Sequence, residues 1–136
     1  LKYGTRVGLA LVSVAGPLSN VLVAVLVAIP LRLGLPMPGE LSVLLLYIIV
    51  ANLSLAVFNL LPLPPLDGFS ILTGILSQIP GLWTYQVAQL FRVVESQGPL
   101  LLLGVIFLDW MMPGQGILGT LMGPPFRLLL SLIVGV

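Results

Sequence analysis

Asp67 is the residue of this sequence whose type and position point most clearly to chemistry. It stands in Pro62-Leu-Pro-Pro-Leu-Asp-Gly68, between two apolar segments that are each long enough to cross a membrane. An aspartate at bilayer depth costs about 2.5 to 3.5 kcal/mol on insertion scales, so it needs a partner such as a metal ion or a hydrogen-bond donor. Two interpretations stay open. Asp67 caps a helix that begins at Phe69, or it faces a water-accessible cavity as a metal ligand or proton carrier.

Three asparagines are the other polar side chains of interest, because an amide in hydrocarbon needs a hydrogen-bond partner. Asn20 shares a helical face with Ser13 and Gly16, and this ridge of small and polar residues favours contact with protein. Asn52 and Asn59 lie two turns apart on one face of the next apolar segment. We expect all three to point inward. Asn20 and Asn59 also have a simpler interpretation, as hydrogen bonds between packed helices worth about 0.6 kcal/mol each.

The composition places the elements that carry these residues in a membrane. Of 136 residues, 59% are apolar and 7% are charged, against roughly 25% charged in a soluble domain. Such a chain cannot hide its apolar surface in a small soluble fold, which excludes an ordinary cytosolic enzyme, a nucleic-acid binder and a disordered tail. Cysteine is absent, so disulfides and thiolate metal sites are excluded as well.

The apolar runs and their breaks predict an all-α, polytopic protein with one membrane domain over residues 1–136. Three prolines in the Asp67 segment break the helix, and Gly68 is expected to permit a sharp turn. The third apolar run is short for a full span and is expected to borrow residues from an amphipathic helix before it, which should lie on the membrane interface. The predicted spans are residues 7–31, 41–61, 99–112 and, as a candidate fourth that is broken at Gly123-Pro124-Pro125, 117–136; the interfacial helix is 82–96.

Several residues near the predicted membrane surface have ordinary structural explanations. Trp83 and Trp110 are typical of the aromatic belt, and Asp109 beside Trp110 is expected to be an isolated interfacial anchor. Arg92 and Glu95 are spaced for a solvated ion pair on one helix, worth a few tenths of a kcal/mol. None of these residues is expected to take part in chemistry.

Two motifs resemble those of the site-2 protease family of intramembrane zinc metalloproteases. Phe58-Asn-Leu-Leu-Pro-Leu-Pro-Pro-Leu-Asp-Gly68 resembles the family's Asn-x-x-Pro-x-Pro-x-x-Asp-Gly signature. Ala15-Gly-Pro-Leu-Ser-Asn20 resembles the Ala-Gly-Pro-x-x-Asn motif of an earlier transmembrane helix. The resemblance covers most of Tyr3 to Leu103, and the spacing is similar to small bacterial and archaeal members. It therefore implies a multi-pass protein of a prokaryotic cell membrane.

The resemblance implies roles for particular residues. It makes Asp67, followed by Gly68, the third protein ligand of a catalytic zinc, and Asn59 a residue that holds the substrate backbone or the developing oxyanion. The other two ligands and the general base would come from a His-Glu-x-x-His helix, whereas this sequence has no histidine. In such a site the metal activates a water and polarises the scissile carbonyl. Asn20 and Asn52 would help to shield the water-containing cavity from lipid.

The missing histidines leave alternatives for the function. Leu1 is not an initiator methionine, so we expect a piece of a longer protease whose partners are transmembrane protein substrates. The alternative is an inactive, protease-like accessory subunit that packs against neighbouring membrane subunits. A transporter fragment that binds an ion through Asp67 would need an inverted repeat, and none is found. The 136 residues alone are expected to be inactive.

Overall fold

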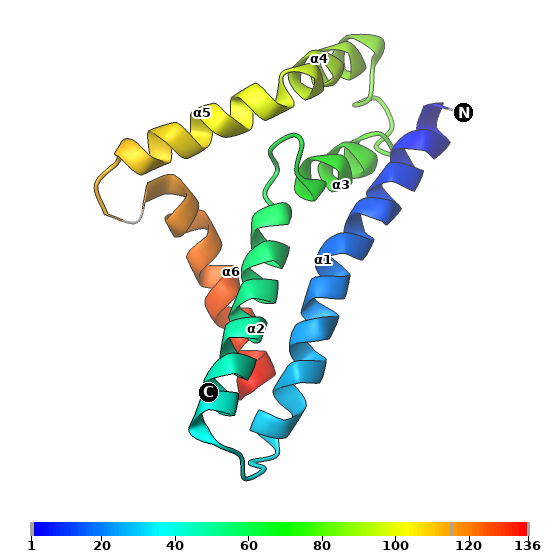
Figure 1. Cartoon of the computed structure of the whole chain (residues 1–136). Coiled ribbons are helices and arrows are strands. Elements are labelled where there is room, and N and C mark those ends of the chain that lie inside the picture. The colour runs from blue at the N-terminus through cyan, green and yellow to red at the C-terminus, as the bar shows by residue number, and fades with distance from the viewer. Residues whose placement is uncertain (1, 115, 136) are drawn as a thin grey trace.

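The computed structural model describes residues 2–114 and 116–135, and over these residues it is built of helices without a strand (Figure 1). The predicted all-α class is therefore confirmed. The helices are α1 (Lys2–Arg32), α2 (Gly39–Asn59), α3 (Asp67–Leu76), α4 (Tyr85–Ser96), α5 (Gly98–Met111) and α6 (Gly116–Val134).

The core lies where α1 and α2 pack side by side in antiparallel directions. Ala24 and Ala28 of α1 meet Ile49 and Leu53 of α2, and all four side chains are at most 1% exposed. Small residues let helices approach closely. The resulting van der Waals contacts hold the helices together in lipid, where the hydrophobic effect does not drive their association. The second half of α6 covers the same cluster. This three-helix contact is the frame on which α3 and the Pro-rich segment are mounted.

Three of the described helices are long and apolar enough to cross a membrane, namely α1 from Thr5 onward, α2 and α6. α4 and α5 pass the same test only as a pair, and they are bent by 66° at their junction. This confirms the predicted three to four membrane-length helices, although the third predicted span, 99–112, reaches that length only together with α4. Figure 1 shows the α4–α5 pair lying across the end of the bundle that carries α3.

The predicted break at Gly123-Pro124-Pro125 is wrong, because α6 runs through both prolines as one helix. The Cδ atom of a proline clashes with the Cβ atom of the preceding residue when that residue is helical. Gly123, which precedes Pro124, has no Cβ. The two prolines still remove two backbone donors. One turn earlier, the Thr120 hydroxyl donates to the Gly116 carbonyl at 2.8 Å. α6 therefore continues through both prolines, of which the first follows a glycine.

Side chains from other helices satisfy the two ends of α6. Asp109 accepts a hydrogen bond from the Leu118 amide at 2.8 Å, so it caps the start of α6 and is not the isolated anchor that we predicted. At the other end, the Arg32 guanidinium donates to the carbonyls of Leu132 and Ile133. A cation at this end also suits the helix dipole. These contacts tie α6 to α5 and to the end of α1.

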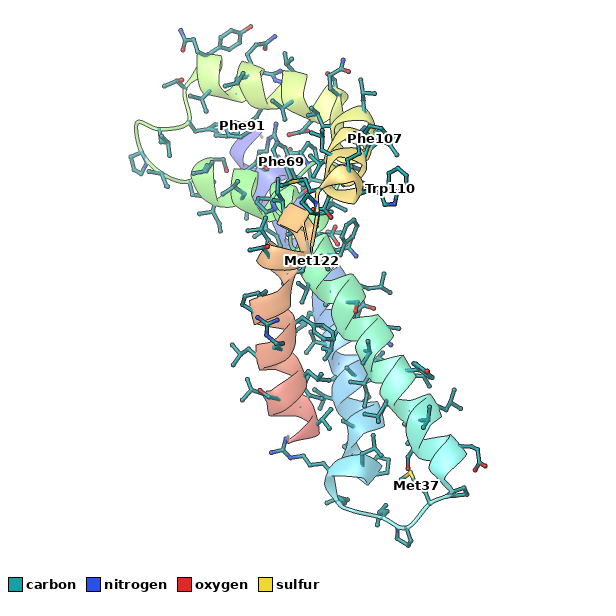
Figure 2. The ribbon with its side chains drawn as sticks, turned by 90° about the vertical axis from the view of Figure 1, so that its left-hand side faces the viewer. Met37, Phe69, Phe91, Phe107, Trp110 and Met122 are labelled. Atoms are coloured by element: carbon teal, nitrogen blue, oxygen red, sulfur yellow. The ribbon has the colours of Figure 1, made fainter. Side chains whose placement is uncertain are left out.

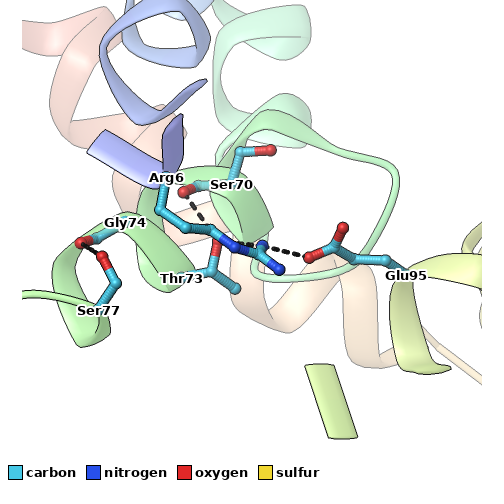
Figure 3. A network of polar contacts seen from close by, with 6 residues as sticks. All are labelled: Arg6, Ser70, Thr73, Gly74, Ser77 and Glu95. Carbon is cyan, nitrogen blue, oxygen red and sulfur yellow. Dashed lines mark hydrogen bonds and ion pairs between the residues drawn. The ribbon is translucent and has the colours of Figure 1, made fainter. Parts of the chain in front are cut away.

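A polar network around Arg6 holds α4 against α1 and α3 (Figure 3). Arg6 pairs with the Glu95 carboxylate and donates to the Thr73 hydroxyl at 3.4 Å. Thr73 is 1% exposed and donates in turn to the Ser70 carbonyl at 3.1 Å. The predicted Arg92–Glu95 pair is wrong, because in the described part of the chain Glu95 pairs with Arg6. A contact between such distant parts of the chain leaves no trace in local spacing.

Removing the carboxylate from this network is expected to loosen α4 without unfolding the bundle. A partly exposed ion pair contributes up to about 1 kcal/mol, so Glu95→Gln should speed hydrogen exchange of the α4 amides by up to about five-fold. Glu40→Gln, at the distant start of α2, is the matched control. Unchanged exchange in α4 of Glu95→Gln would show that the pair does not hold the helix.

Candidate functional site

The Pro-rich segment, residues 60–66, links the end of α2 to the start of α3 through a short, locally bonded turn. Three of its residues are prolines, which removes three backbone donors within four positions, and α2 ends at Asn59, before the first of them. The Leu63 amide donates to the Leu61 carbonyl, and the Leu66 amide donates to the Leu63 carbonyl, both at 2.8 Å. The Pro64–Pro65 peptide bond is cis. The two hydrogen bonds give the segment a defined backbone that sets where α3 begins.

Gly68 lets the first turn of α3 pack directly against the end of α2. A Cβ at this position would overlap the backbone carbonyl oxygens of Leu60 and Leu61. Gly68 is buried, and it is not among the glycines with positive φ. The predicted sharp turn is therefore not the reason for this glycine. The requirement is close approach of two stretches of backbone.

Asp67 is the first residue of α3, two residues earlier than the predicted start, and its carboxylate faces α1. The position that a Cβ on Gly16 would occupy lies 2.9 Å from the Asp67 Oδ2 atom. Leu66 is the N-cap, and no side chain caps this helix. The half-buried carboxylate thus lies between the positive end of the α3 dipole and the bare backbone of Gly16. The two motifs that were separate in sequence meet at this contact.

The length of α1 indicates the depth of this carboxylate. Arg6 and Arg32 are about 39 Å apart along the helix, close to the roughly 40–45 Å thickness of a bilayer with its headgroups. Gly16 lies about 15 Å along α1 from Arg6. A bilayer whose headgroups meet both arginines would therefore place Asp67 within its hydrocarbon core.

The three asparagines are half-buried, and the side-chain hydrogen bonds of Asn52 and Asn59 go to their own helix rather than to Asp67. Asn59, the last residue of α2, donates to a carbonyl one turn earlier in the same helix at 2.9 Å. Asn52 makes the same bond at 2.9 Å. Asn20 lies one turn beyond Gly16 on α1. A hydrogen bond from a side-chain amide to a carbonyl of its own helix satisfies that donor in an apolar medium. The predicted roles of these residues toward a substrate stay predictions.

Sequence reasoning missed Gly98, which brings the α4–α5 junction onto the Pro-rich segment. Gly98 is buried, and a Cβ there would come within 3.1 Å of the Pro64 Cβ. Pro99 follows it in the first turn of α5, where the missing N–H costs no hydrogen bond. The Gly98-Pro99 pair was a visible signal, but the residue it packs against is known only from the fold.

Asp67 is suited to be one ligand of a zinc site and cannot complete one with its neighbours. Within residues 2–114 and 116–135, no three His, Cys, Asp or Glu side chains come together around a metal-sized space. The whole sequence has neither histidine nor cysteine. Protein zinc sites use three or four such ligands. The fit is therefore that of a single carboxylate, and any further ligands would come from outside this chain.

Comparison with known proteins decides the family. The model described as Peptidase family M50 matches residues 34–94, which include α2, the Pro-rich segment, Asp67 and most of α4. The chain is also 34% identical over 125 residues, 91% of its length, to the "Putative zinc metalloprotease sll0528" of Synechocystis sp.. The chain belongs to the site-2 protease family. The family that the sequence resembles is thereby confirmed.

Membership of the site-2 protease family makes zinc the family cofactor, as the name of the cyanobacterial relative states for that protein. The chain spans about 30% of the length of that relative. No solved structure matches the chain. The family and the membrane-length helices together describe a membrane protein related to site-2 metalloproteases.

Proposed function

We propose that this chain is part of an intramembrane zinc metalloprotease and that Asp67 supplies one carboxylate ligand to its zinc. The observation that carries the proposal is the contact of Asp67 with Gly16, which brings the family's two motifs to one place. The remaining ligands and the general base would come from a His-Glu-x-x-His helix outside these residues. When bound there, zinc would supply a Lewis acid for the scissile carbonyl and would lower the pKa of a bound water.

The chain's own part in this reaction is to hold a carboxylate still at a depth where charge is costly. The bonded Pro-rich segment and the close packing at Gly68 fix the first turn of α3, and Gly16 leaves room for the carboxylate beside it. A ligand held by rigid elements keeps the coordination geometry that a catalytic metal needs. Asn59, at the junction of α2 and the Pro-rich segment, is proposed to bind the substrate backbone.

The proposed substrates are transmembrane segments of other proteins. Hydrolysis at that depth requires a water-containing cavity that protein shields from lipid. The paired faces of α1 and α2 supply part of such a wall, with Asn20 and Asn52 as its polar members. A multi-pass arrangement in the membrane follows from this proposal, since α1, α2 and α6 are each of membrane length.

The protein expressed from its complete reading frame provides the test. We expect it to retain zinc after purification and to cleave a single-span substrate in vesicles. A zinc chelator should stop the cleavage, and added zinc should restore it. A complete frame without a His-Glu-x-x-His helix, purified without zinc and with stoichiometric membrane partners, would instead establish the accessory subunit.

The contact at Gly16 gives a further expected result for the complete protein. Gly16→Ala puts a methyl group 2.9 Å from Asp67 Oδ2, so the carboxylate has to move. We expect zinc affinity to fall about ten-fold, as when groups that orient a ligand are changed. Gly8→Ala on the same helix meets open space and is the matched control. Equal zinc affinity in the two variants would show that Gly16 does not position the carboxylate.

A further inference from the structure

A cavity lies at the N-terminal end of α1, away from Asp67. It has a volume of about 260 Å³, and α1, the α3–α4 connection and α4 all contribute to its wall. Two guanidinium groups and an indole are among the side chains that line it. The lining residues are Thr5, Arg6, Trp83, Ala88 and Arg92.

The cavity carries a net positive charge. Arg6 is neutralised by Glu95, and its guanidinium carbon lies 5.3 Å from the centre of the Trp83 ring. Arg92 is exposed, and within the described residues it has no ion-pair partner. Because Glu95 neutralises Arg6, the positive charge of Arg92 is not compensated within the cavity. An anion is therefore the ligand that this cavity favours.

An aromatic stack makes one wall of the cavity rigid. The rings of Trp83 and Phe91 are stacked, with centroids 5.4 Å apart and an interplanar angle of 19°. Phe91 also contacts Phe69 of α3 at 5.7 Å, and Figure 2 shows these two side chains directed toward each other. Such aromatic pairs are more stable than burial of their area alone would make them. The indole is thus held in place beside the guanidinium groups before any ligand binds.

The position of the cavity along α1 points to the source of the anion. Arg6 lies at one end of the stretch that matches the thickness of a bilayer, and α4 is amphipathic. Tryptophan and arginine both favour the headgroup level. We propose that the cavity binds the phosphate of an anionic phospholipid headgroup, such as that of phosphatidylglycerol. Guanidinium groups bind phosphate oxygens through paired, charge-assisted hydrogen bonds. The proposal is independent of proteolysis.

Native mass spectrometry of the full chain tests this inference. The chain is released from detergent that contains equal amounts of phosphatidylglycerol and phosphatidylcholine, and the ratio of the two bound lipids is measured. We expect one phosphatidylglycerol to be retained preferentially. Arg92→Gln should lower the ratio about five-fold, the effect of about 1 kcal/mol for one basic residue at a lipid surface. Arg92→Lys should keep most of it, because the charge remains.

Arg127→Gln is the matched control, since Arg127 is an exposed arginine on α6 outside the cavity. An unchanged ratio in Arg92→Gln, or an equal loss in Arg127→Gln, would overturn the site. Millimolar inorganic phosphate distinguishes the two sources of the anion. Lipid retained in its presence supports the headgroup, and lipid displaced by it would overturn the lipid assignment in favour of a free anion.

Discussion

Asp67→Ala is expected to remove the zinc from the complete protein and to abolish peptide cleavage. The loss of one of three protein ligands should lower zinc affinity and cleavage rate by roughly a hundred-fold or more. The thermal stability of the helical bundle should stay the same or rise, because the substitution removes a carboxylate held at a depth where charge is costly. Metal analysis, a cleavage assay and thermal unfolding of the same preparation measure the three quantities.

Glu40→Gln is the control for this experiment, because it removes an acid from the opposite end of α2. The combination of results distinguishes a ligand from a structural residue. A purely structural Asp67 at the positive end of α3 would lose about 0.3 to 1 kcal/mol of stability on substitution and would keep zinc and cleavage. That outcome would contradict the zinc-ligand role.

Gly68→Ala is expected to cause the largest loss of stability among single methyl additions in this site. The added Cβ overlaps two backbone carbonyl oxygens, those of Leu60 and Leu61, and backbone cannot rotate away as a side chain can. We expect the free energy of unfolding to fall by about 3 kcal/mol, the upper part of the range for overpacking. Denaturant titration in detergent, followed by circular dichroism, measures the change.

Gly104→Ala is the matched control, since a Cβ at Gly104 of α5 meets nothing within 4 Å. Alanine is the better helix former by up to about 1 kcal/mol, so this variant should be at least as stable as the natural protein. Two variants with equal stability would mean that the end of α2 yields to the methyl group, and that the close approach does not hold α3.

The sequence predicted the structure best where a residue type tolerates few environments. The low charge and long apolar runs require lipid as the solvent, and three prolines near Asp67 require a break in the helix. The paired motifs were enough to recognise the family. Local rules were less reliable where a glycine or a distant partner intervened. The α6 helix ran through two prolines, the first of which follows Gly123, and Glu95 paired with Arg6 rather than with Arg92.

By itself, the sequence determined the helical class, the membrane-length segments and the Pro-rich break that carries Asp67, because these follow from the apolar length and the proline content of each segment. Tertiary structure alone decided that Asp67 faces Gly16, that Gly98 packs on Pro64 and that Arg6 closes the network under α4. These contacts join residues far apart in the chain. Their geometry depends on how closely the helix axes approach, and that distance is set by packing of the whole bundle rather than by any one segment.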